Sequence, residues 1–380
     1  MQDSPVLLAV DGNSLVHRSF HSQAGTGLRS ADGRPLWAIR GLLTQLVAAA
    51  ERICPTAIVV GFDDPLASHR RTRWPQYKAS RTEKLHTLIS QLDGAAEVLR
   101  SMGIVVVVPD GLEADDVLAS AARFAPQAGA RTVIMTSDRD SFALIDEHTR
   151  VLRIINGGVD ASPLLTPDLL GLMLGIRPEQ YCDYAALRGD PSDNLPGVRG
   201  VGAKTAARLL ATMGSAAAVF DDLAAGGARV RAAVGSAAAN RLAQPEARLA
   251  WELNCQVMRM HNDLELGLDL TGGPGVLPLD PAAVGAAFRA HQLTWTTPAA
   301  LQFLAYQDPP QRPAEHAWST SSGSGRPAGA VRHPAGFDGR AGGATRTAAE
   351  HGRPAGRRFG KLAKHASQPQ DAAVQLSLFD

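Results

Sequence analysis

Carboxylates follow each of four apolar segments in the first half of the sequence. They are, in chain order, Asp11, then Asp63 and Asp64, then Glu113, Asp115 and Asp116 of GLEADD, then Asp138 and Asp140 of TSDRD. Any one of them alone is explained by a helix N-cap or a first-turn acid. As a set they would repel one another unless cations neutralised them. Oxygen ligands without His or Cys favour Mg²⁺, or Mn²⁺ as a substitute, over zinc.

A second acidic pair, Asp190 and Asp193 of RGDPSDNLPG, has i, i+3 spacing. A turn explains the pair taken alone, but a ligand role fits it better beside the other acids. Two ions about 4 Å apart can activate a water and stabilise the leaving oxygen of a phosphodiester displacement. That chemistry needs no nucleophilic side chain, and the sequence holds no GxSxG, GxxxxGK[ST] or HExxH motif.

Periodicity predicts the elements that must position these acids. Strand-like segments at 6–10, 57–62, 104–108, 132–136 and 151–155 alternate with amphipathic helical patterns. We therefore expect an α/β domain over 1–165, with a mainly parallel sheet and helices on both faces. The carboxyl ends of parallel strands meet at one edge, which would bring the acids together.

Helical patterns follow, with start signals at Thr166-Pro167 and Arg177-Pro178, and predict a helical domain over 166–307. Residues 308–374 are rich in Pro, Gly, Ala, Ser and Arg, which predicts a disordered basic linker. The net charge of +1 alone indicates no partner. Three scattered cysteines without a CxxC pair, and no membrane-length apolar run, fit a cytoplasmic protein without a membrane.

A basic segment within residues 64–90, SHRRTRWPQYKASRTEK, carries Arg70, Lys78 and Arg81 with Trp74 and Tyr77 interleaved. A solvated helix face is the usual explanation of such a run. Because its charge is nearly all of one sign, we expect it to bind backbone phosphates while the aromatic rings stack on unpaired bases.

A glycine-rich turn follows the second acidic pair. In LPGVRGVGAKT the residues that would form a backbone cradle for phosphate at a helix start are Gly197, Gly200, Gly202, Lys204 and Thr205. At the far end of the sequence, residues 375–380 close the polar tail with leucines and a phenylalanine. A chance apolar end is the alternative. QLSLF resembles the bacterial sliding-clamp-binding peptide, in which Gln375, Leu376, Leu378 and Phe379 would make the contacts.

The motifs EADD, TSDRD, GDPSDNLPGV and GVGAKTA, in this order, resemble the bacterial 5′-nuclease family of flap endonucleases and the N-terminal domain of DNA polymerase I. The resemblance covers roughly residues 5–270. It implies a PIN-like domain, a helical arch over the active site and a helix-three-turn-helix element, with K⁺ often held at residues 197–205. His17, Leu112 and Arg139 depart from the family pattern, but no metal ligand is missing.

The resemblance also implies residue roles. The first metal would be held by Asp11, Asp63, Glu113 and Asp115. The second would be held by Asp138, Asp140 and Asp193, with Asp116 and Asp190 in support. Near the scissile phosphate would lie Arg18, Arg70, Lys78 and Arg81.

We therefore expect a stand-alone, monomeric 5′-3′ exonuclease or flap endonuclease of the nucleoid, acting in replication and repair. Its substrates would be DNA with 5′ ends, flaps or branches, and RNA primers. Two alternatives are an RNA-cleaving PIN nuclease, which normally lacks the glycine turn, and a non-catalytic module that binds branched DNA, in which several carboxylates would be lost.

Overall fold

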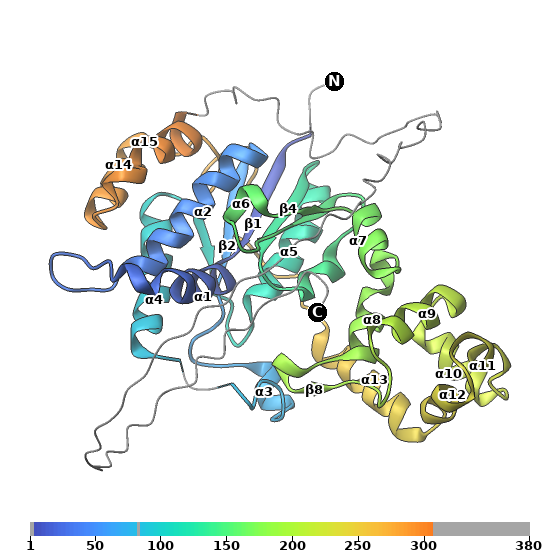
Figure 1. Ribbon diagram of the computed structural model, residues 1–380. Helices are drawn as coiled ribbons and strands as arrows, with labels where there is room; N and C mark the ends of the chain where they lie inside the picture. Colours follow the sequence, from blue (N-terminus) through green and yellow to red (C-terminus); the bar gives the residue numbers. More distant parts are fainter. Residues whose placement is uncertain (1–3, 82–83, 307–380) are drawn as a thin grey trace, which may run out of the picture. The chain divides into compact units, whose positions relative to one another are not determined.

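The computed structural model describes residues 4–81 and 84–306, so the predicted linker and the predicted clamp peptide lie outside the described residues. Its centre is a six-stranded sheet in the order β3-β2-β1-β4-β5-β6 (Figure 1). The strands are β1 Val6–Asp11, β2 Ala57–Gly61, β3 Val105–Val107, β4 Arg131–Thr136, β5 Thr149–Arg153 and β6 Leu164–Leu165. The first five run parallel, which confirms the predicted mainly parallel sheet, and β6 is antiparallel to β5.

Helices cover both faces of the sheet, as predicted. Leu8 and Val10 point to one face, where they pack under α1 Gly12–Gln23, α2 Trp37–Ile53 and α4 His86–Ser101. Leu7 and Ala9 point to the opposite face and pack under α5 Ala114–Gln127. Because β1 is buried on both faces, its sequence is continuously apolar rather than alternating.

Helices dominate after residue 166. The short α6 Gly158–Ala161 precedes them, and they are α7 Pro167–Leu174, α8 Tyr181–Arg188, α9 Ala203–Met213, α10 Ala216–Ala224, α11 Ala228–Val234, α12 Ser236–Leu242, α13 Pro245–Met258, α14 Pro281–Ala290 and α15 Thr297–Ala300. The Thr166 hydroxyl accepts from the Leu169 N–H at 3.2 Å, and Pro167 opens α7, so the predicted helix start is confirmed.

The chain returns to the sheet near its described end. Gly275 and Leu277 hydrogen-bond to the backbone at Ile58 and Thr56, and α14 packs into the core beneath α4. The predicted helical domain 166–307 therefore includes a final part that covers the sheet. Two-residue strands β7 Gly189–Asp190 and β8 Leu195–Pro196 form a small antiparallel sheet that the sequence did not predict. No helix among residues 4–81 and 84–306 is long and apolar enough to cross a membrane.

Candidate active site

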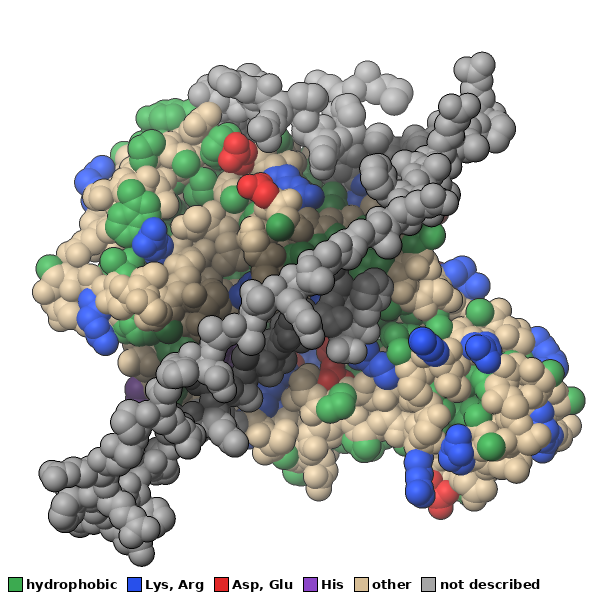
Figure 2. Space-filling model, in the orientation of Figure 1, with side chains coloured by type: hydrophobic (Ala, Val, Ile, Leu, Met, Phe, Trp, Pro, Cys, Tyr) green, Lys and Arg blue, Asp and Glu red, His purple; other side chains and the backbone are tan. Residues whose placement is uncertain are grey.

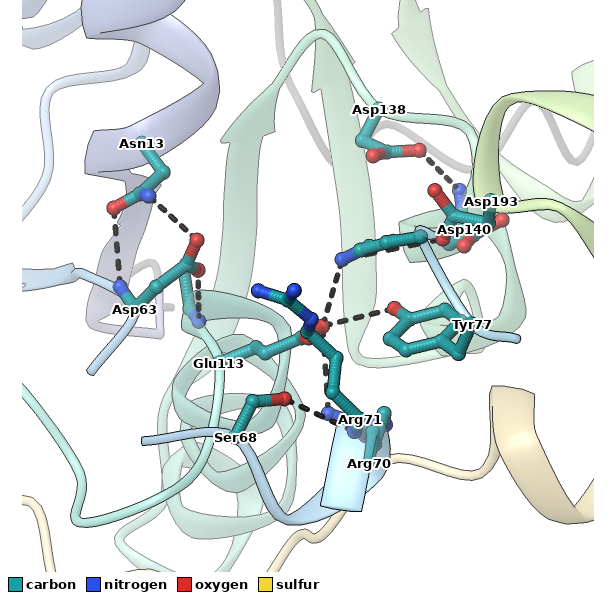
Figure 3. A network of polar contacts seen from close by, with 12 residues as sticks. Asn13, Asp63, Ser68, Arg70, Arg71, Tyr77, Glu113, Asp138, Asp140 and Asp193 are labelled. Atoms are coloured by element: carbon teal, nitrogen blue, oxygen red, sulfur yellow. Dashed lines mark hydrogen bonds and ion pairs between the residues drawn. The ribbon is translucent and has the colours of Figure 1, made fainter. Parts of the chain in front are cut away.

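Asp11 and Asp63 stand at the ends of neighbouring strands β1 and β2. One oxygen of Asp11 caps α1 by accepting from the Ser14 N–H at 2.8 Å, and the other accepts from the Thr136 hydroxyl at 2.7 Å. The Asn13 side chain donates to Asp63 at 2.6 Å and accepts from its backbone N–H at 3.0 Å (Figure 3). Both carboxylates are therefore fixed in place by the start of α1.

Glu113 and Asp115 stand at the start of α5. The Glu113 carboxylate accepts from the Tyr77 hydroxyl at 3.0 Å and from Lys78 Nζ at 2.9 Å. In Figure 3, Glu113 lies between Asp63 on one side and Asp138, Asp140 and Asp193 on the other. The start of α5 therefore lies between two groups of carboxylates.

The remaining acids come from the loop after β4 and from the loop after β7. Asp138 accepts from the Asp140 N–H at 3.1 Å, and Asp193 is buried and bound by Arg81 at 2.5 Å. Asp190 caps a single helical turn, Pro191–Asp193, by accepting from the Ser192 N–H at 2.8 Å. Asp190 is thus a turn former, while Asp193 faces the cations of the basic segment.

Two adjoining pockets share Glu113 and Asp115. The larger has a volume of about 540 Å³, and its acidic lining residues are Asp11, Asp63, Glu113, Asp115 and Asp138. The smaller is lined by Glu113, Asp115, Asp140 and Asp193. The structure thus brings predicted carboxylates from five segments together at one edge of the sheet. Asp64 instead accepts from the Leu66 N–H in its own loop and from the Gly111 N–H in the loop after β3.

Burial and mutual repulsion make the charged forms of these acids costly. Burial raises the pKa of Asp11 to about 7, against the hydrogen bonds from Ser14 and Thr136, and the charges of Asp138 and Asp63 raise it further. Burial, followed by the charge of Asp138, also raises the pKa values of Asp115 and Asp140 well above the ordinary range. Such a set of carboxylates would be stabilised by added positive charge.

Hard divalent cations fit this donor set. Within the described residues, no three Asp, Glu, His or Cys side chains are already close enough together to hold an ion, and Lys78 and Arg81 form ion pairs with Glu113 and Asp193. Oxygen donors of this kind suit Mg²⁺ or Mn²⁺. The larger pocket offers Asp11, Asp63, Glu113 and Asp115, and the smaller offers Asp140 and Asp193.

Asp116 and Arg70 lie differently from the other predicted site residues. Asp116 is fully buried and forms a two-pronged ion pair with Arg70, at 2.7 and 2.8 Å, instead of facing either carboxylate group. Helix geometry turns successive side chains apart, so Asp115 lines both pockets while its neighbour points into the protein. The predicted base stacking by Tyr77 is wrong, because its ring is buried against Leu195 and Val257.

The other predicted basic residues reach the larger pocket. Lys78, Arg81 and Arg18 line it, and Arg18 donates to the Asn156 side chain at 2.7 Å. Asn13 was not predicted as a site residue, although its position two residues after Asp11 was the available signal. His17 was not predicted to have a site role either, but it lines the pocket, and its pKa is lowered to about 4 by burial and then by the charge of Lys84.

The glycine turn has the conformation that its residues predict. An added Cβ at Gly197 would lie 2.0 Å from the Arg188 carbonyl oxygen, and Gly200 has a φ of +79°. Lys204 and Thr205 open α9, and the Arg241 side chain packs over Gly200. The contact between Arg241 and Gly200 could not be predicted, because the two residues lie far apart in the sequence. A helix-three-turn-helix element with K⁺ stays a prediction.

Figure 2 shows Lys and Arg side chains gathered over the helical part of the molecule, where few acidic side chains are visible. The exposed cations on α9 and α11 through α13 are Lys204, Arg208, Arg229, Arg231, Arg241 and Arg248. A surface of this kind attracts polyanions without reading sequence.

Several known proteins are similar to this chain in sequence or in fold. Residues 6–166 match the N-terminal resolvase-like domain of the 5′-3′ exonuclease family, and residues 176–273 match its C-terminal SAM fold. DNA polymerase I of Mycobacterium tuberculosis is 38% identical over 239 residues, and the thermostable DNA polymerase I of Thermus aquaticus is 38% identical over 217. These stretches cover 63% and 57% of this chain, but 26% and 25% of the polymerases.

Solved structures agree on the fold. A T5 5′-exonuclease structure with bound zinc has a TM-score of 0.55 at 17% identity, covering 77% of this chain and 98% of that one. A complex of the bacteriophage T5 flap endonuclease with DNA and metal ions has a TM-score of 0.53 at 18% identity, covering 79% and 99%. The predicted enzyme class and fold are thus confirmed: the chain belongs to the 5′-3′ exonuclease family across residues 6–273, as a nuclease whose carboxylate pocket fits divalent metal ions.

Proposed function

We propose that this protein is a structure-specific 5′-3′ exonuclease and flap endonuclease that hydrolyses DNA phosphodiesters with two divalent metal ions. The observation that carries the proposal is the pair of adjoining pockets in which carboxylates from five segments meet the cations of the basic segment. When bound, the ions would supply an activated water and neutralise the leaving oxygen.

The chain's own residues would do the rest. Asp11, Asp63, Glu113 and Asp115 would hold one ion, while Asp140 and Asp193, with Asp138 close by, would hold the other. Lys78 lies within reach of both groups, and Arg81 forms an ion pair with Asp193. They would exchange a carboxylate for a phosphate of the bound strand and so hold the scissile bond near the ions.

The helical part would hold the duplex. The glycine turn and the exposed cations of α9 and α11 through α13 suit phosphate contacts, which position a duplex without reading its bases. The basic segment would bind the strand that carries the 5′ end. A role in removing flaps and RNA primers during replication and repair follows from that substrate geometry.

The C-terminal peptide extends the proposal to a partner. Gln375, Leu376, Leu378 and Phe379 would dock in an apolar pocket of the bacterial sliding clamp, and the linker 308–374 would act as a tether. A random coil of that length spans on the order of 45 Å, which raises the local concentration of the nuclease at a junction. We propose that a monomer works in this way in the cytoplasm, at the nucleoid.

The two alternatives are less well supported. An RNA-cleaving PIN nuclease does not need the glycine turn or the matched C-terminal domain. A non-catalytic branched-DNA module does not need the carboxylates, and here seven of them line the two adjoining pockets: Asp11, Asp63, Glu113, Asp115, Asp138, Asp140 and Asp193.

Substrate preference tests the proposal. The full chain with Mg²⁺ is given four 5′-labelled substrates: a flap, a nicked duplex, an RNA-primed duplex and an unbranched single-stranded RNA. We expect cleavage of the first three and slow or no cleavage of the fourth. Preferred cleavage of single-stranded RNA would support the PIN alternative, and absence of cleavage on every substrate would support the non-catalytic module.

A further inference from the structure

Arg70 and Asp116 form the most completely bonded ion pair near the site. Both N–H arms of the Arg70 guanidinium reach the two oxygens of Asp116, at 2.8 and 2.7 Å. Arg70 is 7% exposed and Asp116 is 0% exposed. The two residues are 46 positions apart in the sequence, on α3 His69–Arg73 and on the first turn of α5.

The pair also holds a third segment, the residues that follow α13. Arg70 donates to the carbonyl oxygens of Val257 at 3.2 Å and Arg259 at 2.9 Å. Asp116 accepts from the His261 N–H at 2.7 Å. The contact continues one turn along α5, where the Ser120 hydroxyl accepts from the Leu264 N–H at 3.1 Å. The basic segment, α5 and the residues that follow α13 therefore meet at one buried ion pair.

This bonding leaves neither residue free for a metal or a phosphate. Each Asp116 oxygen already accepts two donors, from Arg70 and from the backbone N–H of either His261 or Glu113. Arg70 uses its Nε as well as both terminal nitrogens on protein acceptors. Its 3.5 Å approach to Glu113 comes from the same buried position. A charged pair saturated in this way orients other groups and does not bind substrate.

We propose that Arg70 and Asp116 are positioning residues that keep the basic segment and the end of α13 in register with the metal-binding carboxylates of α5. This inference rests on the proposed nuclease function. Lys78 lies eight residues after Arg70, and Glu113 lies three residues before Asp116. The Arg70–Asp116 ion pair would therefore set where the phosphate-binding cations lie relative to the carboxylates. Its loss should change where the strand is cut.

The test maps cleavage sites on a 5′-labelled flap at single-nucleotide resolution under single-turnover conditions, using the full chain. The variants are Arg70→Gln, Asp116→Asn and the double variant that carries both. Arg100→Gln is the control, because Arg100 is an exposed arginine on α4 and lies outside the basic segment. We expect cuts spread over neighbouring phosphodiesters and a rate lowered on the order of 100-fold, as for a misplacement of about 1 Å. The control should keep the wild-type cutting position.

Two further readouts separate positioning from direct binding. If Asp116 were a metal ligand, Asp116→Asn would raise the Mg²⁺ concentration for half-maximal rate, and the proposal would be overturned. If Arg70 bound a phosphate, Arg70→Gln would lower the slope of log K against log salt by about 0.7 to 0.9. We expect both quantities to match the wild type. Variants that cut at the wild-type position and rate would also overturn the proposal.

Hydrogen exchange of the backbone amides tests the role of the ion pair where cleavage assays cannot, because a variant that does not fold also cuts no DNA. A single variant leaves an unpaired buried charge and can lose its fold, whereas the double variant removes both charges. We expect faster exchange at residues 257–264 in the double variant and unchanged exchange in Arg100→Gln. Unchanged exchange in the double variant would contradict the proposal. A wild-type protein that cuts no flap would refute the proposed function, and the exchange result would still decide the role of the pair.

Discussion

Lys78 Nζ lies 2.9 Å from Glu113 Oε2 and 3.9 Å from Asp193 Oδ2, so one cation of the basic segment spans the two carboxylate groups. Burial lowers the pKa of Lys78, but the charges of Glu113 and Asp193 outweigh it and leave the pKa raised. Lys78 is therefore charged at neutral pH and competes with any other cation for these carboxylates.

Lys78→Ala should therefore strengthen Mg²⁺ binding but slow catalysis. Without the competing ammonium group, the Mg²⁺ concentration for half-maximal rate should fall, while the single-turnover rate should drop at least tenfold because a phosphate contact is lost. A Mg²⁺ titration of flap cleavage measures both quantities. Lys78→Arg, which keeps the charge, is the control and should stay near the wild type in its Mg²⁺ requirement. A higher Mg²⁺ requirement in Lys78→Ala would contradict the assignment.

The stability of the metal-free protein should fall as pH rises through 7. The pKa of Asp11 is raised to about 7 in the folded state, so its contribution to stability is full below the unfolded value of about 4 and is lost as pH passes 7. Asp115 and Asp140 act in the same direction. His17, with a lowered pKa, acts oppositely, but only below about pH 6.5.

The measurable window is therefore pH 6.5 to 8. We expect the melting temperature without metal to decrease across it, and Mg²⁺ to raise the melting temperature more at pH 8 than at pH 6.5. Asp11→Asn should flatten the metal-free curve and weaken the Mg²⁺ effect. An equal Mg²⁺ effect at both pH values would show that these carboxylates do not bind the ion.

Gly197→Ala should damage the glycine turn, because the new Cβ would lie 2.0 Å from the Arg188 carbonyl oxygen. Forcing an atom into such a contact costs about 1 to 3 kcal/mol. Thermal unfolding and a duplex-binding titration should both report the loss. Gly202→Ala is the matched control in the same turn, since an added Cβ there has no neighbour within 4 Å. Equal stability and binding of the two variants would argue against a tight turn at 197.

Deletion of residues 375–380 should abolish binding to a purified bacterial sliding clamp and leave clamp-independent flap cleavage unchanged. The reason is that the proposed anchor follows a long predicted tether in the sequence and includes none of the residues that line the carboxylate pockets. A titration of full-length and truncated proteins measures the difference. Equal clamp affinity for the two proteins would contradict the proposed binding of residues 375–380 to the clamp.

The sequence predicts the sheet and the convergence of the carboxylates because both depend on local patterns. Apolar runs mark β1, β2 and β4, which are buried on both faces, and an acid stands at the end of each strand or within two residues of it. The two-residue strands β6, β7 and β8 carry too little pattern to be predicted. Parallel pairing then places the strand ends together without further information.

Contacts between distant segments could not be predicted. In EADD the adjacent Asp115 and Asp116 look equivalent, yet one lines the pockets and the other pairs with Arg70. Which of two neighbouring side chains faces the pocket depends on how α5 packs, and periodicity does not specify that. Tyr77 was misassigned for the same reason, since its burial depends on Leu195 and Val257, which lie more than a hundred residues away.

The central claim is that the gathered carboxylates cleave DNA through bound metal ions. The most direct measurement is single-turnover cleavage of a 5′-labelled flap by the full chain in EDTA, after addition of Mg²⁺, and for Asp11→Ala and Asp140→Ala. We predict no cleavage in EDTA, full recovery with Mg²⁺, a 5′-phosphate on the newly exposed end, and no cleavage by either variant despite nearly normal DNA binding. Undiminished cleavage in EDTA, or by both variants in Mg²⁺, would contradict the two-metal account.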